Sequence, residues 1–141
     1  MYFYCLCKLI LLVIILFLFE DNFVKLIFEC KGIMRQRTLS KPANLSGSGL
    51  HTGKPVQVAF LPAKANHGIT FVRTDRPSSL PIPAVWGNVI STQRATVLGV
   101  QDVNVRTVEH VMAAVFGSGI SNLRIELNAE ELPILDGSSR I

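Results

Sequence analysis

Cysteine is missing from most of this 141-residue chain, because all three cysteines lie within residues 1–33 and none follows Met34. A disulfide framework is therefore excluded after Met34, and nothing there indicates an oxidising compartment. Residues 1–33 also lack proline and histidine, whereas they hold five of the eight phenylalanines. This change in composition predicts two parts, an apolar N-terminal extension over residues 1–33 and a domain over residues 34–141.

Clustered positive charge is also lacking, although the chain carries fourteen Lys and Arg against ten Asp and Glu, a net charge of +4. Aromatic residues are not interleaved with the basic ones, which argues against a nucleic-acid-binding module. The charge excess lies entirely after Met34. A mildly basic domain suits an anionic ligand such as a nucleotide diphosphate, and it also fits an ordinary solvated surface.

No apolar run is long enough to be a membrane span by itself. The uninterrupted run over residues 9–19 has eleven residues, whereas a spanning helix needs about 20. An anchor over residues 1–19 requires Lys8 to extend to the membrane surface. A cleaved signal peptide fits less well, because no positive charge leads the run and no A-x-A pattern follows it. In a third interpretation Met34 is the true start. We expect a cytoplasmic protein, anchored to a membrane if residues 1–33 are genuine.

The part after Met34 is expected to be an α+β domain in which helices cover one face of a sheet. Strands are predicted over residues 55–60, 68–73, 95–100, 103–106 and 123–127, several of them by alternation of apolar and polar side chains. A helix is predicted from Val108, because Val111, Met112 and Val115 follow at helical spacing. Residues 76–83 contain three prolines and are expected to lack regular structure.

The start of this expected helix carries a carboxylate and an imidazole side by side, Glu109 and His110. Thr107 is predicted to be the N-cap, because its hydroxyl can accept from an unpaired backbone N–H. Glu109 then lies in the first turn, where the helix dipole favours a negative charge. Such a pair suits a general base beside a metal ligand. Most pairs of this kind are solvated surface, and one histidine is not a metal site, since catalytic zinc usually has three protein ligands.

Glycines and single polar residues elsewhere have simpler interpretations. Gly47, Gly49 and Gly53 are expected to serve turns that need positive φ. Trp86 is expected to pack against the domain. Arg73 is expected to lie on a solvated loop face, although it could also meet a phosphate.

Four motifs in order resemble one family of enzymes, the UDP-3-O-acyl-N-acetylglucosamine deacetylases. They are Gly-Ser-Gly-Leu-His-Thr-Gly over residues 47–53, Ser-Thr-Gln-Arg-Ala-Thr-Val-Leu over 91–98, Thr-Val-Glu-His over 107–110, and the segments 122–128 and 132–138, the latter with Pro-Ile-Leu-Asp-Gly-Ser. The resemblance implies a zinc-dependent amide hydrolase of lipid A biosynthesis, which removes the N-acetyl group from a UDP-linked acylated glucosamine. It implies the first of two similar α+β domains, incomplete at its C-terminus.

The resemblance also implies roles for single residues. His110 would be a zinc ligand and Glu109 the general base that activates water. His51 would lie near the substrate, and Asp136 would be chiefly structural. In the family the remaining zinc ligands, a histidine and an aspartate, belong to a second domain that would lie beyond Ile141. This chain alone is therefore expected to be inactive. The alternative function is a non-catalytic remnant of such an enzyme, anchored to a membrane through residues 1–19.

Overall fold

The computed structural model describes residues 35–137. The extension over residues 1–33, with its expected anchor, lies outside the described residues. Residues from Gln36 onward form one unit with its own core. Within the described part of the chain, no helix is both long and apolar enough to cross a membrane.

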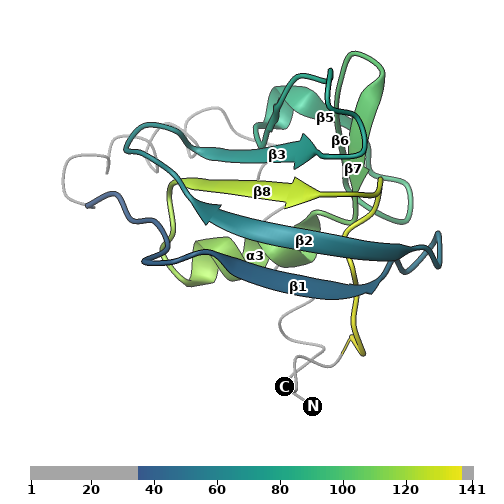
Figure 1. Ribbon diagram of the computed structural model, residues 1–141. Helices are drawn as coiled ribbons and strands as arrows, with labels where there is room; N and C mark the ends of the chain where they lie inside the picture. Colours follow the sequence, from purple (N-terminus) through teal and green to yellow (C-terminus); the bar gives the residue numbers. More distant parts are fainter. Residues whose placement is uncertain (1–34, 138–141) are drawn as a thin grey trace. The chain divides into compact units, whose positions relative to one another are not determined.

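The larger sheet has five strands in the order β1-β2-β8-β3-β4. Figure 1 shows β1, β2, β8 and β3 side by side in this order. Their bounds are β1 Ala43–Ser48, β2 Pro55–Pro62, β8 Leu123–Leu127, β3 Ile69–Arg73 and β4 Ile82–Pro83. β8 is the last strand in sequence but lies at the centre, antiparallel to β2 and parallel to β3. The segment that follows the helix therefore lies between two strands, β2 and β3, that come much earlier in the sequence.

The smaller sheet has three antiparallel strands, β5 Val89–Ser91, β6 Val97–Val100 and β7 Val103–Arg106. The strands predicted over residues 95–100 and 103–106 are confirmed as β6 and β7, which pair with Val97 opposite Arg106. A short 3-10 helix, η2 Trp86–Asn88, precedes this sheet. β7 ends at Arg106, so only two residues separate the smaller sheet from the start of the α-helix at Glu109.

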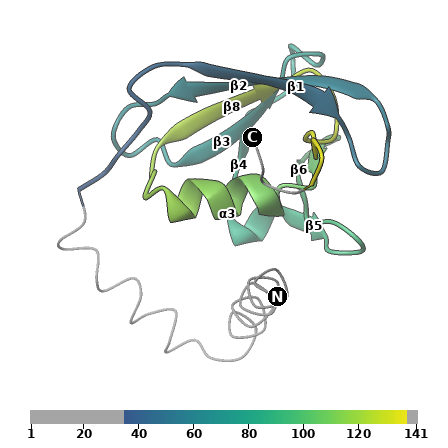
Figure 2. The same ribbon diagram turned by 90° about the horizontal axis from the view of Figure 1, so that it is seen from below.

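One α-helix among the described residues, α3 Glu109–Gly117, lies against one face of the larger sheet (Figure 2). Val108 and Val115 are buried, and Val111 and Met112 pack against the same core. On the facing strand β8 the apolar residues Leu123, Ile125 and Leu127 are buried, and each such side chain stabilises the fold by roughly 1.5–3 kcal/mol. The α+β class is confirmed, with a single α-helix rather than several covering the face in residues 35–137.

Three expectations about individual segments are wrong, one of them only in part. Residues 76–81 lack regular structure as expected, but Ile82 and Pro83 pair with β3 as an edge strand, a place where a proline is tolerated because its missing N–H faces outward. Arg73 is buried, donates from Nε and Nη2 to Asp75 at 2.8 and 2.7 Å, and donates from Nη1 to a backbone carbonyl. Trp86 is 85% exposed, so its side chain lies at the surface and is not buried in the domain.

Candidate functional site

The helix that carries Glu109 and His110 begins without the expected side-chain cap. Val108 occupies the N-cap position, and no side chain caps the helix there. Thr107 instead has φ of +59° and is buried. A β-branched residue in this left-handed region costs roughly 1–3 kcal/mol, so surrounding contacts must hold it there. The prediction of Thr107 as N-cap is therefore wrong, and its hydroxyl serves another partner.

Glu109 lies in the first turn of α3, as predicted, and is half-buried. Its Oε2 accepts a hydrogen bond of 3.0 Å from the backbone N–H of Thr96. Thr96 adjoins β6, so the small sheet fixes the direction of this carboxylate. The Oε1 atom accepts no hydrogen bond from residues 35–137, which leaves one oxygen able to take a proton from a bound molecule.

His110 follows on an exposed position of the same turn. Among residues 35–137 no group of three or more His, Cys, Asp or Glu side chains is arranged to hold a metal ion. A single imidazole beside one carboxylate fits part of a zinc site, and a catalytic zinc needs about three protein ligands. The described residues thus supply at most part of the ligand set of such a site.

A second carboxylate, that of Glu131, is the centre of the hydrogen bonding near this helix. Its side chain is only 1% exposed. Oε1 lies 2.7 Å from Nδ1 of His51, and Oε2 accepts from the backbone N–H of Thr52 at 2.8 Å. The backbone N–H of His51 donates to both oxygens at 3.1 Å. The Thr107 hydroxyl donates to Oε1 at 2.8 Å. Glu131 therefore joins the His51 turn to the residue that precedes the helix N-cap.

These contacts keep Glu131 ionised. Burial alone would raise the pKa of its carboxyl group, but the hydrogen bonds from the His51 ring, from the two backbone N–H groups and from Thr107 outweigh burial and lower that pKa to about 2. A buried carboxylate is stable here because four donor groups converge on it.

Backbone pairing explains why these segments meet. Arg106 donates its N–H to the Glu130 carbonyl at 2.8 Å and accepts from the N–H of Leu132 at 3.2 Å. On the other side, the N–H of Ile134 donates to the Ser48 carbonyl at 3.1 Å. The segment after β8 is therefore held between the end of β7 and the end of β1, which places the Glu131 side chain between the two.

In the glycine turn, residues 47–53, two of the glycines allow the segment around Glu131 to approach the backbone closely. Of the three glycines predicted to need positive φ, only Gly53 has it, at +62°. A Cβ on Gly49 would lie 2.5 Å from Oε2 of Glu131 and 2.5 Å from Oγ1 of Thr52, and a Cβ on Gly47 would lie 2.9 Å from Pro133. The prediction is thus wrong for Gly47 and Gly49, where the missing side chain gives room to the segment around Glu131.

Asp136 lies in a turn between two residues of positive φ, Leu135 at +56° and Gly137 at +69°. The N–H of Gly137 donates to the Ile134 carbonyl at 3.1 Å, which closes the turn. This position suits the structural role expected of Asp136, which stays a prediction.

The role of Glu131 could not be recognised from the sequence, because Glu131 matches no ligand motif and local spacing connects it to no other chemical group. The available signal was a pair of adjacent carboxylates, Glu130 and Glu131, directly before the apolar residue Leu132. That signal cannot identify a partner eighty positions away.

Comparison with known proteins places the chain among deacetylases. It belongs to the UDP-3-O-acyl N-acetylglycosamine deacetylase family, whose sequence model matches residues 36–141. It is 54% identical over 104 residues to the UDP-3-O-acyl-N-acetylglucosamine deacetylase of Myxococcus xanthus, a match covering 74% of this chain and 33% of that protein. It is 49% identical over 107 residues to the Cellvibrio japonicus deacetylase, covering 76% of this chain and 35% of the relative. It is 48% identical over 107 residues to a bifunctional LpxC/FabZ enzyme of Chlorobaculum tepidum, covering 76% and 23%. The chain spans about a third of the length of the deacetylases it matches.

Proposed function

We propose that this chain supplies the general base and one zinc ligand of a UDP-3-O-acyl-N-acetylglucosamine deacetylase, an amide hydrolase of lipid A biosynthesis. The observation that carries the proposal is the placement of Glu109 and His110 together in the first turn of α3. Membership of the family and the names of the relatives support the substrate, a UDP-linked acylated glucosamine. The reaction would take place in the cytoplasm.

Glu109 acts as the base in this proposal. Its Oε2 is held by the Thr96 N–H, while Oε1 remains available to accept a proton from the attacking water. The position at the helix N-terminus favours the ionised carboxylate, which is the form a base requires. When bound, zinc would polarise the amide carbonyl and lower the pKa of its bound water.

His110 would bind that zinc through its imidazole, because it is exposed beside Glu109. The other ligands would come from residues that correspond to the remaining two thirds of the relatives. His51 would contact the substrate, and the chain's net charge of +4 suits the diphosphate of the nucleotide.

A chimera tests this function. Residues 36–141 of this chain would replace the matching segment of the Myxococcus xanthus deacetylase, which is 54% identical over 104 residues. Glu109→Ala should reduce kcat about 10²–10⁴-fold, the usual cost of losing a general base, with zinc content unchanged. His110→Ala should lose activity and zinc together, because it removes a donor atom from the metal.

Glu126→Gln is the matched control, because this carboxylate pairs with Arg124 on the surface of β8 at 2.7 Å. It should retain the activity of the unmodified chimera. Full activity of Glu109→Ala with normal zinc content would show that the base lies elsewhere.

A further inference from the structure

We propose that Glu131 is a positioning residue that fixes the tautomer of His51 and holds the His51 turn against the start of helix α3. The proposal rests on the proposed function, since it assigns His51 and the helix start to one working site. Nothing in the motif that suggested the family connects Glu131 to either of them. The connection appears only in the folded chain, through four donor groups on one carboxylate.

The tautomer follows from the chemistry of the pair. An ionised carboxylate only accepts hydrogen bonds, so the Nδ1 atom of His51, 2.7 Å from Oε1, must carry the proton. In the neutral ring the lone pair is then on Nε2. The His51 side chain is 30% exposed, and Nε2 makes no hydrogen bond to residues 35–137. In this neutral form the ring presents an oriented acceptor, suited to a hydroxyl or amide N–H of a bound sugar.

The same carboxylate also reaches the helix start. Oε1, which accepts from the His51 ring, accepts from the Thr107 hydroxyl at 2.8 Å. Thr107 lies two residues before Glu109 and is held in the left-handed region of φ. A change at Glu131 therefore acts on two elements together, the His51 ring and the backbone that leads into α3.

Positioning differs from simple structural support in its consequences. A buried acceptor that only supports the fold would affect stability and leave the ring tautomer of His51 unimportant. A positioning carboxylate makes the effect of Glu131 depend on His51. Replacement of a residue that orients a metal-ligating histidine typically costs about 10–100-fold in activity, and we expect a loss of the same order for a residue that orients a substrate-binding histidine.

The first arm of the experiment uses the 141-residue chain and needs no activity. Nitrogen-15 NMR of its three histidine rings reports which nitrogen of each carries the proton. We expect His51 to be protonated at Nδ1 in the unmodified chain and to lose this preference in Glu131→Gln. The amide offers one acceptor oxygen in place of two. An unmodified chain in which neutral His51 carries its proton on Nε2 would overturn the proposal without any variant.

The second arm measures kcat and KM in the Myxococcus chimera. Glu131→Gln should lower kcat/KM about 10–100-fold with unchanged zinc content. Added to His51→Ala, it should cause a smaller loss than it causes alone, because the part of its effect that acts through His51 is already gone and only the part through Thr107 remains. Independent, additive losses would show that Glu131 does not work through His51.

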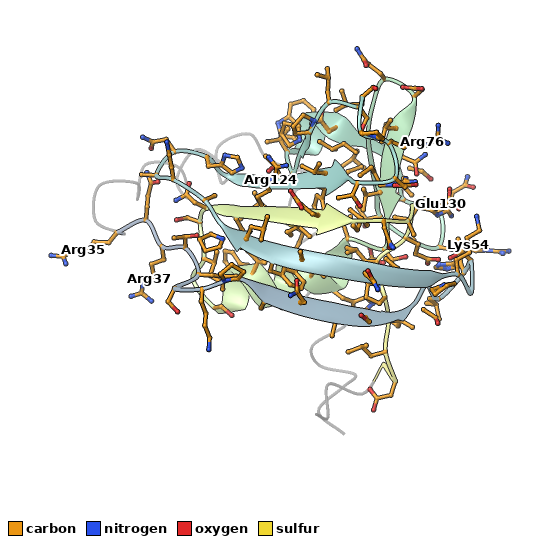
Figure 3. All side chains as sticks on the ribbon, viewed as in Figure 1. Arg35, Arg37, Lys54, Arg76, Arg124 and Glu130 are labelled. Atoms are coloured by element: carbon orange, nitrogen blue, oxygen red, sulfur yellow. The ribbon has the colours of Figure 1, made fainter. Side chains whose placement is uncertain are left out.

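Glu130→Gln is the matched control. Glu130 is the adjacent carboxylate, but its side chain is 39% exposed and meets Lys54 at 3.8 Å on the surface (Figure 3). It should change neither the His51 tautomer nor kcat/KM. A chimera that is inactive even without substitutions would contradict the proposed function, while the NMR arm would still decide the tautomer.

Discussion

The Nδ1 atom of His51 lies 2.7 Å from Oε1 of Glu131, although eighty positions separate the two residues. His51 belongs to the glycine turn after β1, and Glu131 follows the central strand β8. Both sit beside the backbone that enters α3, because Thr107 donates to the same carboxylate. The Glu131 carboxylate therefore connects the glycine turn, the segment after β8 and the backbone before α3. Glu109 and His110 follow directly in the first turn of that helix.

The Glu131 carboxyl group is expected to make stability depend on pH. Its folded-state pKa is lowered from an ordinary value of 4.5 to about 2. A lowered pKa means that the ionised group stabilises the fold fully above about pH 4.5, and that this contribution disappears as the pH falls through about 2. The contribution amounts to about 3 kcal/mol.

Urea unfolding of the unmodified chain and of Glu131→Gln over this pH range measures the effect. The difference in the free energy of unfolding should be large near neutral pH and shrink steadily below about pH 4.5. Glu130→Gln should follow the unmodified chain throughout, because Glu130 pairs only across the surface. A constant difference between the unmodified chain and Glu131→Gln at every pH would contradict the assignment.

Gly49→Ala is expected to destabilise the domain by about 1–3 kcal/mol, the usual cost of forcing an extra carbon into a packed site. The new Cβ would lie 2.5 Å from Oε2 of Glu131, which is closer than real side chains allow. Gly117→Ala is the control: it lies at the end of α3 with nothing within 4 Å of the added carbon. It should be neutral or stabilise by up to about 1 kcal/mol. Equal effects in thermal or urea unfolding would show that the Gly49 contact is unimportant.

Thr107 offers a matched pair of substitutions that separates the hydroxyl from the strained backbone. Thr107→Val keeps the branched shape and the strain at φ of +59° but removes the donor to Glu131. It should cost about 1–3 kcal/mol, because a buried hydrogen bond to a charged group is lost. Thr107→Ser keeps the hydroxyl and should stay within about 1 kcal/mol of the unmodified chain. Urea unfolding of both decides, and a Thr107→Val chain as stable as Thr107→Ser would show that the hydroxyl does not hold this turn.

The sequence predicted much of the framework because its signals are local. Alternation on β8 and the spacing of Val108 and Val115 identified the strand and the helix, and both are confirmed. The Glu109 position in the first turn followed from the same spacing. The partner of Thr107 could not be predicted, since a left-handed threonine is unfavourable locally and exists only because tertiary contacts hold it. Likewise the missing Cβ of Gly49 could be understood only once Glu131 was beside it.

Zinc binding gives the sharpest test of how much of a metal site this chain contains. We expect residues 34–141 to bind zinc no better than an ordinary histidine-bearing surface, because His110 is the single residue matched to a ligand position. No group of three potential ligands is arranged for a metal within residues 35–137. Residues 1–33 should be omitted, since they hold three cysteines whose thiolates bind zinc themselves.

Equilibrium dialysis of residues 34–141 with zinc measures this directly. His67→Gln is the control, because the His67 ring is already engaged with Thr70 at 2.8 Å. Weak binding that is equally small in the unmodified segment, in His67→Gln and in His110→Ala supports the expectation. Tight binding of one zinc per chain that disappears with His110→Ala alone would show that other residues of this chain complete the site. The proposal that the other zinc ligands come from residues that correspond to the remaining two thirds of the relatives would then be wrong.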